Sequence, residues 1–248
     1  MKYNEIIEKS KIICYPCVHD DYSVSVDIGT IGLMDRFFPG KGVDVAFGKG
    51  DIYKTYFANN HHFNIMWQQS VVAPCIMGLF GMCFNMNDFC RTPYTLRTGD
   101  DLQDLSFLKP REEQSFSVTD IESGCVVEKD SLFRDDSDDF CMETYAYTNY
   151  HRFLWCAHKC ALIKNNRIRN GKSLIVSCDS QMIPVIPILA CYFGEILHLD
   201  RRGWYDISGY LERDYDCVLV AHWCSDSCLE TSFFNKMYVN FQQDVPAM

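Results

Sequence analysis

The chain has 248 residues, of which 48% are hydrophobic and 23% charged, and its formal net charge is −10. This length and composition predict one folded domain with its own core and exclude a disordered chain. The negative charge disfavours binding to nucleic acid, and no apolar run reaches the roughly 18 residues that a membrane helix needs.

The first half of the chain carries few clear elements. Residues 1–18 have scattered charges and no apolar core of a secretory signal, so we expect a cytoplasmic protein. Val43–Phe47 predicts a short strand, and Asn64–Phe80 predicts a helix that Pro74 kinks or stops. From about 100 to 140 the sequence is acidic and without periodicity, which predicts an irregular insertion.

The second half alternates strands and helices. We expect strands at 173–177, 195–199 and 216–222, and helices at 182–193 and 205–213. This order predicts a central, mostly parallel sheet with right-handed crossovers, flanked by helices in a single α/β domain. Residues 150–166 fit either a hairpin around 157–159 or one helix, and periodicity does not decide between them.

Fourteen cysteines are a high number for this length. Four of them lie in apolar runs: Cys75, Cys178, Cys191 and Cys217. This placement predicts that most of the cysteines are reduced core side chains. Three close pairs occur at Cys14/Cys17, Cys156/Cys160 and Cys224/Cys228. Zinc sites need matched pairs at tight spacing, so we expect no metal and no cofactor, and keep a cysteine-dependent or zinc-bound protein as a third alternative.

One serine lies where parallel sheets bind their ligands. Asp179 and Ser180 follow the predicted strand at 173–177 and precede the predicted helix at Met182. In open α/β sheets, ligands bind beyond the carboxyl ends of the strands, and amides at a helix start can stabilise an oxyanion. The pattern therefore predicts either a nucleophilic serine or a serine that caps the helix.

A serine nucleophile needs a base, and histidine is the usual one. His222 ends the third predicted strand, at the same sheet edge as Ser180, and is one candidate. His198 lies inside a strand, which indicates a structural role. His61 and His62 come directly before the predicted helix at 64–80, where they fit either a catalytic role or a solvated turn.

Gly171–Tyr205, followed by Asp216–Val220, resembles the serine-bearing block of the SGNH-hydrolase-like proteins. The pattern is most similar to the DHHW proteins and the alginate O-acetyltransferases. In that family a Gly-Lys and a hydrophobic strand lead to an Asp-Ser pair, then to a proline and an Asp-x-Arg. The matching residues in this chain are, in order, Asp179, Ser180, Pro187, Asp200 and Arg202.

Upstream, Tyr53–Phe63 is similar to the Asp-His-His-Trp block of the family. His62 matches the histidine that pairs with the nucleophile, Asn60 stands in the place of the aspartate, and Phe63 in that of the tryptophan. The resemblance implies one SGNH-like domain over residues 1–248. It also implies Ser180 as nucleophile, with His62 and Asn60 beside it.

Two departures from the family bear on activity. Asn60 carries no charge to stabilise the imidazolium, and in a serine protease the Asp→Asn change lowers kcat about 10⁴-fold. Ile183 stands where relatives carry a polar residue, which removes a donor from the oxyanion site. Another carboxylate is an alternative partner for the histidine, and three are candidates: Asp27, Asp44 and Asp51.

The resemblance implies a serine-dependent O-acyltransferase or esterase that takes a small acyl donor and a carbohydrate or glycan acceptor. Three residues are expected to bind the substrate or the oxyanion: Asp179, Arg202 and His61. Arg202 also fits a structural ion pair with Asp200. The alternative function is a catalytically degenerate SGNH-like binding protein. The oligomeric state is left open.

Overall fold

The computed structural model describes residues 1, 3–18, 24–25, 31–32, 34–35, 38–45, 65–98, 101–132, 160–200 and 207–223. The first part of the chain contains these elements: α1 (Tyr3–Lys9), β1 (Ser10–Tyr15), β2 (Cys17–Val18), β3 (Val24–Ser25), β4 (Asp44–Val45), α3 (Ile65–Trp67), η2 (Gln68–Val72), α4 (Ala73–Leu79), η3 (Met86–Asp88) and β5 (Phe89–Thr98). The rest contains these: β6 (Asp101–Pro110), β7 (Phe116–Asp120), β8 (Val126–Lys129), β9 (Ala161–Asn165), β10 (Ser173–Cys178), η5 (Ser180–Met182), α5 (Ile186–Ala190), β11 (Glu195–Asp200), α6 (Ser208–Leu211) and β12 (Cys217–Trp223).

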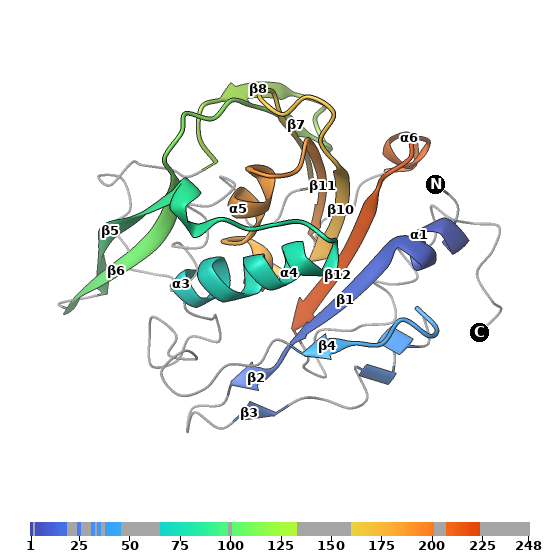
Figure 1. The fold of residues 1–248 in the computed structure, drawn as a ribbon, viewed down its shortest axis with the longest axis horizontal. Coiled ribbons are helices and arrows are strands. Elements are labelled where there is room, and N and C mark those ends of the chain that lie inside the picture. The colour runs from blue at the N-terminus through green and yellow to red at the C-terminus, as the bar shows by residue number, and fades with distance from the viewer. Residues whose placement is uncertain are drawn as a thin grey trace.

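An eight-stranded sheet forms the centre of the described fold, in the order β4-β1-β12-β10-β11-β9-β7-β8 (Figure 1). The pairings among its first five strands are parallel, whereas β9, β7 and β8 extend the sheet by antiparallel pairing. The predicted α/β class with a mostly parallel central sheet is confirmed. Because the five parallel strands share one direction, their carboxyl ends meet along one edge of the sheet.

Both faces of the sheet are covered, which explains why its central strands are apolar along their length rather than alternating. On one face α3, α4 and α5 pack on β10 and β12 through Ile76, Ile188, Val176 and Leu219. On the other face α1, α6 and the segment around Met34 and Phe38 pack on the alternate residues of the same strands. The core is therefore two apolar layers separated by the sheet.

The three strands predicted in the second half are confirmed as β10, β11 and β12. The helix expected at 182–193 is shorter: η5 and a turn precede α5, which has Pro187 in its first turn. The helix expected at 205–213 is found as the shorter α6 at Ser208–Leu211, and residues 205–206 lie outside the described part. Of the open alternatives for 150–166, residues 161–165 form strand β9, and residues 150–159 lie outside the described part.

The helix predicted at 64–80 is confirmed as the continuous run α3, η2 and α4. The η2 segment is a π-helical turn in which the Ala73 N–H donates to the Gln68 carbonyl oxygen. Pro74 has no N–H and its ring crowds the carbonyl four residues earlier, so the wider turn before it relieves that clash. No helix in the described part of the chain combines the length and apolarity needed to cross a bilayer.

Two features of the first half differ from the sequence-based expectation. The region from 100 to 140 is not irregular where it is described, since it contains β6, β7 and β8. Strands β5 and β6 pair along ten residues each, as a hairpin that projects beside the sheet (Figure 1). Strand β1, which the sequence analysis did not predict, pairs with β12 and β4 near the centre of the sheet.

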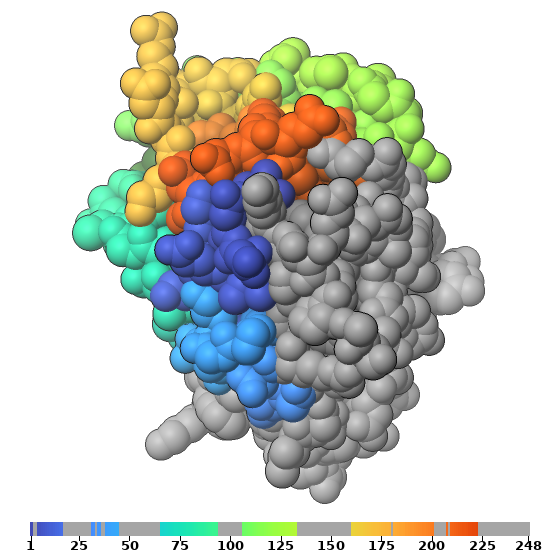
Figure 2. All heavy atoms as spheres, turned by 90° about the vertical axis from the view of Figure 1, so that its right-hand side faces the viewer, coloured from blue at the N-terminus to red at the C-terminus, as the bar shows by residue number. Residues whose placement is uncertain are grey.

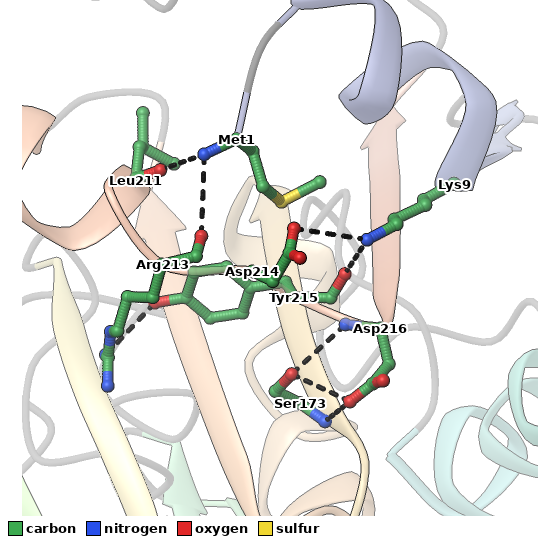
Figure 3. A network of polar contacts seen from close by, with 8 residues as sticks. All are labelled: Met1, Lys9, Ser173, Leu211, Arg213, Asp214, Tyr215 and Asp216. Carbon is green, nitrogen blue, oxygen red and sulfur yellow. Dashed lines mark hydrogen bonds and ion pairs between the residues drawn. The ribbon is translucent and has the colours of Figure 1, made fainter.

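A polar network joins α1, the start of β10 and the segment before β12 at the amino ends of the parallel strands (Figure 3). The Lys9 ammonium donates to the Tyr215 carbonyl oxygen at 2.7 Å and lies 3.5 Å from the Asp214 carboxylate. This contact joins the end of α1 to the segment between α6 and β12, and Figure 2 shows the two segments side by side on the surface. Next to it, Asp216 Oδ2 accepts from Ser173 N at 2.8 Å and from Ser173 Oγ at 2.9 Å. The Asp216 N–H donates back to Ser173 Oγ at 3.1 Å.

Replacing Asp216 by asparagine is expected to weaken the acid dependence of folding. The backbone hydrogen bond from Ser173 lowers the pKa of Asp216 below the ordinary 3.8. A carboxyl group whose pKa is lower in the folded than in the unfolded state stabilises the fold at pH values above its unfolded pKa. This stabilisation is lost as the pH falls through its pKa in the folded state. At neutral pH we expect the free energy of unfolding of the wild type to be at most about 1 kcal/mol higher than that of Asp216→Asn, because the carboxylate is largely exposed.

Urea unfolding of both proteins at neutral pH and near pH 3 measures this difference. The gap in unfolding free energy between them is expected to be smaller near pH 3, because the stabilisation falls with pH below the unfolded pKa and vanishes below the folded one. A gap of equal size at both pH values would show that the ionised carboxylate contributes nothing at this position.

Candidate active site

The carboxyl edge of the parallel strands brings the polar residues of the second half together. The register pairs Cys178 on β10 with Ala221 on β12 and with Asp200 on β11. The next residue after Cys178 is Asp179 and the next after Ala221 is His222, so these two residues lie side by side on neighbouring strands. Ser180 begins η5 directly beyond this row, so its backbone lies at the predicted edge of the sheet.

Asp179 holds the turn that carries Ser180. The residue is 3% exposed, its Oδ1 accepts from Gln181 N at 2.9 Å, and its carbonyl oxygen accepts from Met182 N at 3.2 Å. Asp179, rather than Ser180, is thus the residue that caps the short helix. In the structure the buried Asp179 carboxylate supports the backbone of its own turn, and its expected contact with the substrate or the oxyanion stays a prediction. The amides of Gln181 and Met182 are likewise engaged by Asp179.

Behind this turn lies a buried chain of three side chains. His222 Nδ1 is 4.0 Å from Asp179 Oδ2, and His222 Nε2 is 3.5 Å from Ser177 Oγ. The carboxylate favours the proton on Nδ1, which leaves Nε2 to accept from the Ser177 hydroxyl. The order of the side chains, serine, histidine and aspartate, is that of a catalytic triad, but Ser177 is 1% exposed and His222 is fully buried. A substrate has no access to that hydroxyl, so the chain supports the edge of the sheet.

Two further side chains hold the segment that follows Ser180. The hydroxyl of Tyr15, at the end of β1, donates to Met182 Sδ at 2.9 Å. Burial raises the pKa of Tyr15 well above its ordinary value, and the nearby charges of Asp179 and Cys178 add to the effect, so the phenol is neutral. On the same face of the sheet, Gln69 Nε2 donates to the Pro184 carbonyl oxygen at 2.9 Å.

Gln69 also connects the hairpin to this region. Its Oε1 accepts from the Leu108 N–H on β6 at 2.7 Å, and its side chain is fully buried in η2. One amide side chain therefore joins the base of the β5–β6 hairpin to the segment after η5. The π-helical turn places this polar residue inward, a position that the helical pattern of the sequence did not indicate.

Several predicted site residues lie outside the described part of the chain: Asn60, His61, His62, Phe63, Arg202, Asp27 and Asp51. Among the others, Asp200 ends β11 and is buried. The Ile183 side chain is buried in the apolar core and supplies no polar group to an oxyanion. Asp44 is exposed on β4, three strands from β10 and thus about 14 Å away across the sheet.

The described cysteines differ in part from the expectation of reduced core residues. Cys178 and Cys217 are free and buried, whereas Cys75 is exposed and Cys14 is disulfide-bonded. Burial raises the pKa of Cys160 and of Cys191 to about 12, so both thiols are protonated at neutral pH and are poor nucleophiles. In the part of the chain that is described, no three metal-ligating side chains gather as the ligands of an ion would.

Comparison with known proteins finds relatives in structure only. No family model and no curated protein matches the sequence. A DHHW family protein from Eubacterium siraeum matches with a TM-score of 0.62 and 15% identity, over 94% of this chain and 86% of its own. Bacillus cereus PatB1, solved with a sulfonyl adduct, matches with a TM-score of 0.63 and 16% identity, over 94% and 87%. A second PatB1 structure matches with a TM-score of 0.59 and 17% identity, over 92% of each chain.

These likenesses span nearly the whole of each chain, so they concern the complete fold rather than a shared fragment. At these identities they establish the fold and no more. The likeness implied by the Asp-Ser and His-His blocks of the sequence is confirmed at this level. The chain has a single SGNH-like α/β fold, similar to those of a DHHW family protein and of PatB1.

Proposed function

We propose that the chain is a serine-dependent O-acyltransferase or esterase that acts on a carbohydrate or glycan. The similarity of its fold to PatB1 suggests an acyltransferase-like function. The observation that carries the proposal is the position of Ser180, at the first turn beyond β10 on the carboxyl edge of the parallel strands. The Asp179 cap supports it further, because a nucleophile needs a backbone held in one geometry.

In the proposed reaction, Ser180 Oγ attacks the carbonyl carbon of the acyl donor, and His62 takes the hydroxyl proton. The donor's leaving group departs with a proton returned by His62, and an acyl ester on Ser180 remains. A sugar hydroxyl or water then attacks this ester, His62 again takes the proton, and the Ser180 hydroxyl is restored. Transfer to the sugar gives the acyltransferase, and transfer to water gives the esterase.

The oxyanion that forms in each step needs hydrogen-bond donors. Because Asp179 engages the Gln181 and Met182 amides, the proposal assigns this role to other groups. Arg202 and His61, which the family resemblance places near the substrate, are the candidates. Bacillus cereus PatB1 carries a sulfonyl adduct, and such an adduct forms when a nucleophile attacks an electrophilic sulfonyl group. By analogy, we assign the role of nucleophile in this chain to Ser180.

Covalent labelling tests the proposal. Purified protein is incubated with a fluorophosphonate, and with p-nitrophenyl acetate in parallel, and the modified residue is identified by peptide mass spectrometry. We expect an adduct on Ser180 in the wild type and none in Ser180→Ala, with Ser177→Ala as the matched control that keeps the label. An adduct that persists in Ser180→Ala would overturn the assignment.

A second candidate function is an SGNH-like binding protein without catalysis. The burial of Ile183 and the engagement of the two η5 amides favour it, since they remove donors that catalysis requires. This candidate predicts binding of a glycan by calorimetry in a protein that no fluorophosphonate labels. Labelling at Ser180 counts against it.

A further inference from the structure

The buried side chains behind Ser180 form a continuous chain that ends at the turn itself. Ser177 and Asp179 flank Cys178 at the end of β10, and alternation along the strand points both toward the same face. His222, on the neighbouring strand β12, lies between them, with one ring nitrogen toward each side chain. All three side chains are at most 4% exposed.

The Asp179 carboxylate divides its two oxygens between the turn and the imidazole. Oδ1 accepts from the Gln181 amide, and Oδ2 faces His222 Nδ1. The hydrogen bond to Gln181 spans Ser180, so the rotamer of Asp179 sets the backbone on both sides of that residue. A buried carboxylate keeps one orientation more firmly when its second oxygen also faces a compensating group, and His222 Nδ1 lies 4.0 Å from Oδ2, within ion-pair distance but beyond hydrogen-bond distance.

We propose that His222 is a positioning residue for Ser180: it orients the Asp179 carboxylate that caps η5 and so holds the nucleophile in its reactive geometry. This inference rests on the proposed function and adds a residue that the family pattern does not assign. It gives His222, considered above as a candidate base, a different task. The imidazole is fully buried, and its Nε2 is 3.5 Å from Ser177 Oγ, so it acts on the turn and not on the substrate.

The sheet offers a matched control in His198. It is also a buried histidine, but on β11 it pairs with Val176 of β10 and so lies on the opposite face from Asp179 and His222. Both His222→Leu and His198→Leu replace a buried imidazole by an apolar side chain. A general loss of stability affects both variants, whereas loss of the Asp179 contact affects only the first.

The experiment measures fluorophosphonate labelling of Ser180 in the wild type and both variants, at a temperature where each is folded. For His222→Leu we expect the maximal labelling rate to fall on the order of 10²-fold with little change in reagent affinity, because misplaced reacting groups slow chemistry more than binding. His198→Leu is expected to label at the wild-type maximal rate. His222→Gln, which keeps a donor toward Asp179, is expected to recover part of the loss.

Hydrogen exchange of the peptide that contains Gln181 gives a second readout that does not depend on catalysis. Its amide is expected to exchange faster in His222→Leu than in His198→Leu. Equal labelling and equal exchange in the two variants would overturn the positioning role, even where the wild type is labelled. If the wild type is not labelled while the exchange difference appears, the proposed function fails and His222 still positions the turn.

Discussion

Replacing Asn60 by aspartate is expected to raise kcat for ester hydrolysis, by as much as about 10⁴-fold. The proposal makes His62 the base for Ser180, and a base that receives a proton becomes a cation. An aspartate beside the ring stabilises that cation and holds the tautomer with the proton on the far nitrogen, whereas an amide does neither. Initial rates with p-nitrophenyl acetate measure the change directly.

Asn59 provides the control for this substitution, since Asn59→Asp adds the same charge one residue away. We expect Asn59→Asp to leave kcat near the wild-type value. Adding Ser180→Ala to Asn60→Asp is expected to remove the whole gain, which ties it to the nucleophile. An unchanged kcat in Asn60→Asp would mean that Asn60 does not occupy the place of the family's aspartate.

That outcome leads to the other carboxylates named from the sequence. If one of them already serves the histidine, its replacement by asparagine lowers kcat in an otherwise wild-type protein. Asp44 is the described member of the three, and its exposed place about three strands from β10 makes it a poor partner for a base at Ser180. Asp27 and Asp51 are therefore the variants to compare first.

The strands of the second half could be predicted because each is a short apolar run bounded by turn residues. Asn170-Gly171-Lys172 precedes β10, and Gly194 precedes β11. The structure adds a reason for both glycines: a Cβ on Gly171 would lie 2.7 Å from Gly194 N, so the two turns pack in direct contact. Local residue choice and tertiary packing agree here, which is why pattern alone located these strands.

Strand β1 was missed because its apolar core, Ile12–Tyr15, is only four residues long and follows a helix without a turn signal. Periodicity cannot separate such a run from a buried helix. Strands β6 to β8 were missed for a different reason. Acidic and polar residues dominate this region, and its strands form through pairing with β5 and β9, which a local pattern does not reveal.

The sequence indicated which residues lie at the carboxyl edge of the sheet, but not which buried side chains contact one another behind that edge. The Asp-Ser pair after a buried strand indicated the place of Ser180, and the end of the next strand indicated His222. The partners of His222 were not foreseen, because they depend on the register between β10 and β12. Knowing that Ser177 pairs with Val220 is enough to set Asp179 beside His222, and that pairing is a property of the folded sheet.

Replacing Asp179 by alanine is expected to lower the free energy of unfolding by about 2–4 kcal/mol, because it removes the cap of η5 and leaves the buried Nδ1–H of His222 without the facing carboxylate. The same change removes the acceptor for the Gln181 amide at the start of η5. Asp179→Asn keeps an oxygen in that place and gives up only the charge, so we expect a loss of about 1–2 kcal/mol. Urea unfolding of the three proteins measures both differences.

The double variant Asp179→Ala with His222→Leu distinguishes two contributions of Asp179 to stability: its contact with His222 and its capping hydrogen bond to the Gln181 amide. If the cost of Asp179→Ala comes mainly from the imidazole left behind, removing that imidazole as well is expected to recover part of the lost stability. Strictly additive losses would mean that the two side chains do not interact, and the 4.0 Å contact would then be a matter of proximity alone. Recovery without return of Ser180 labelling is the expected result, because the apolar replacement restores packing but not the cap on which the turn depends.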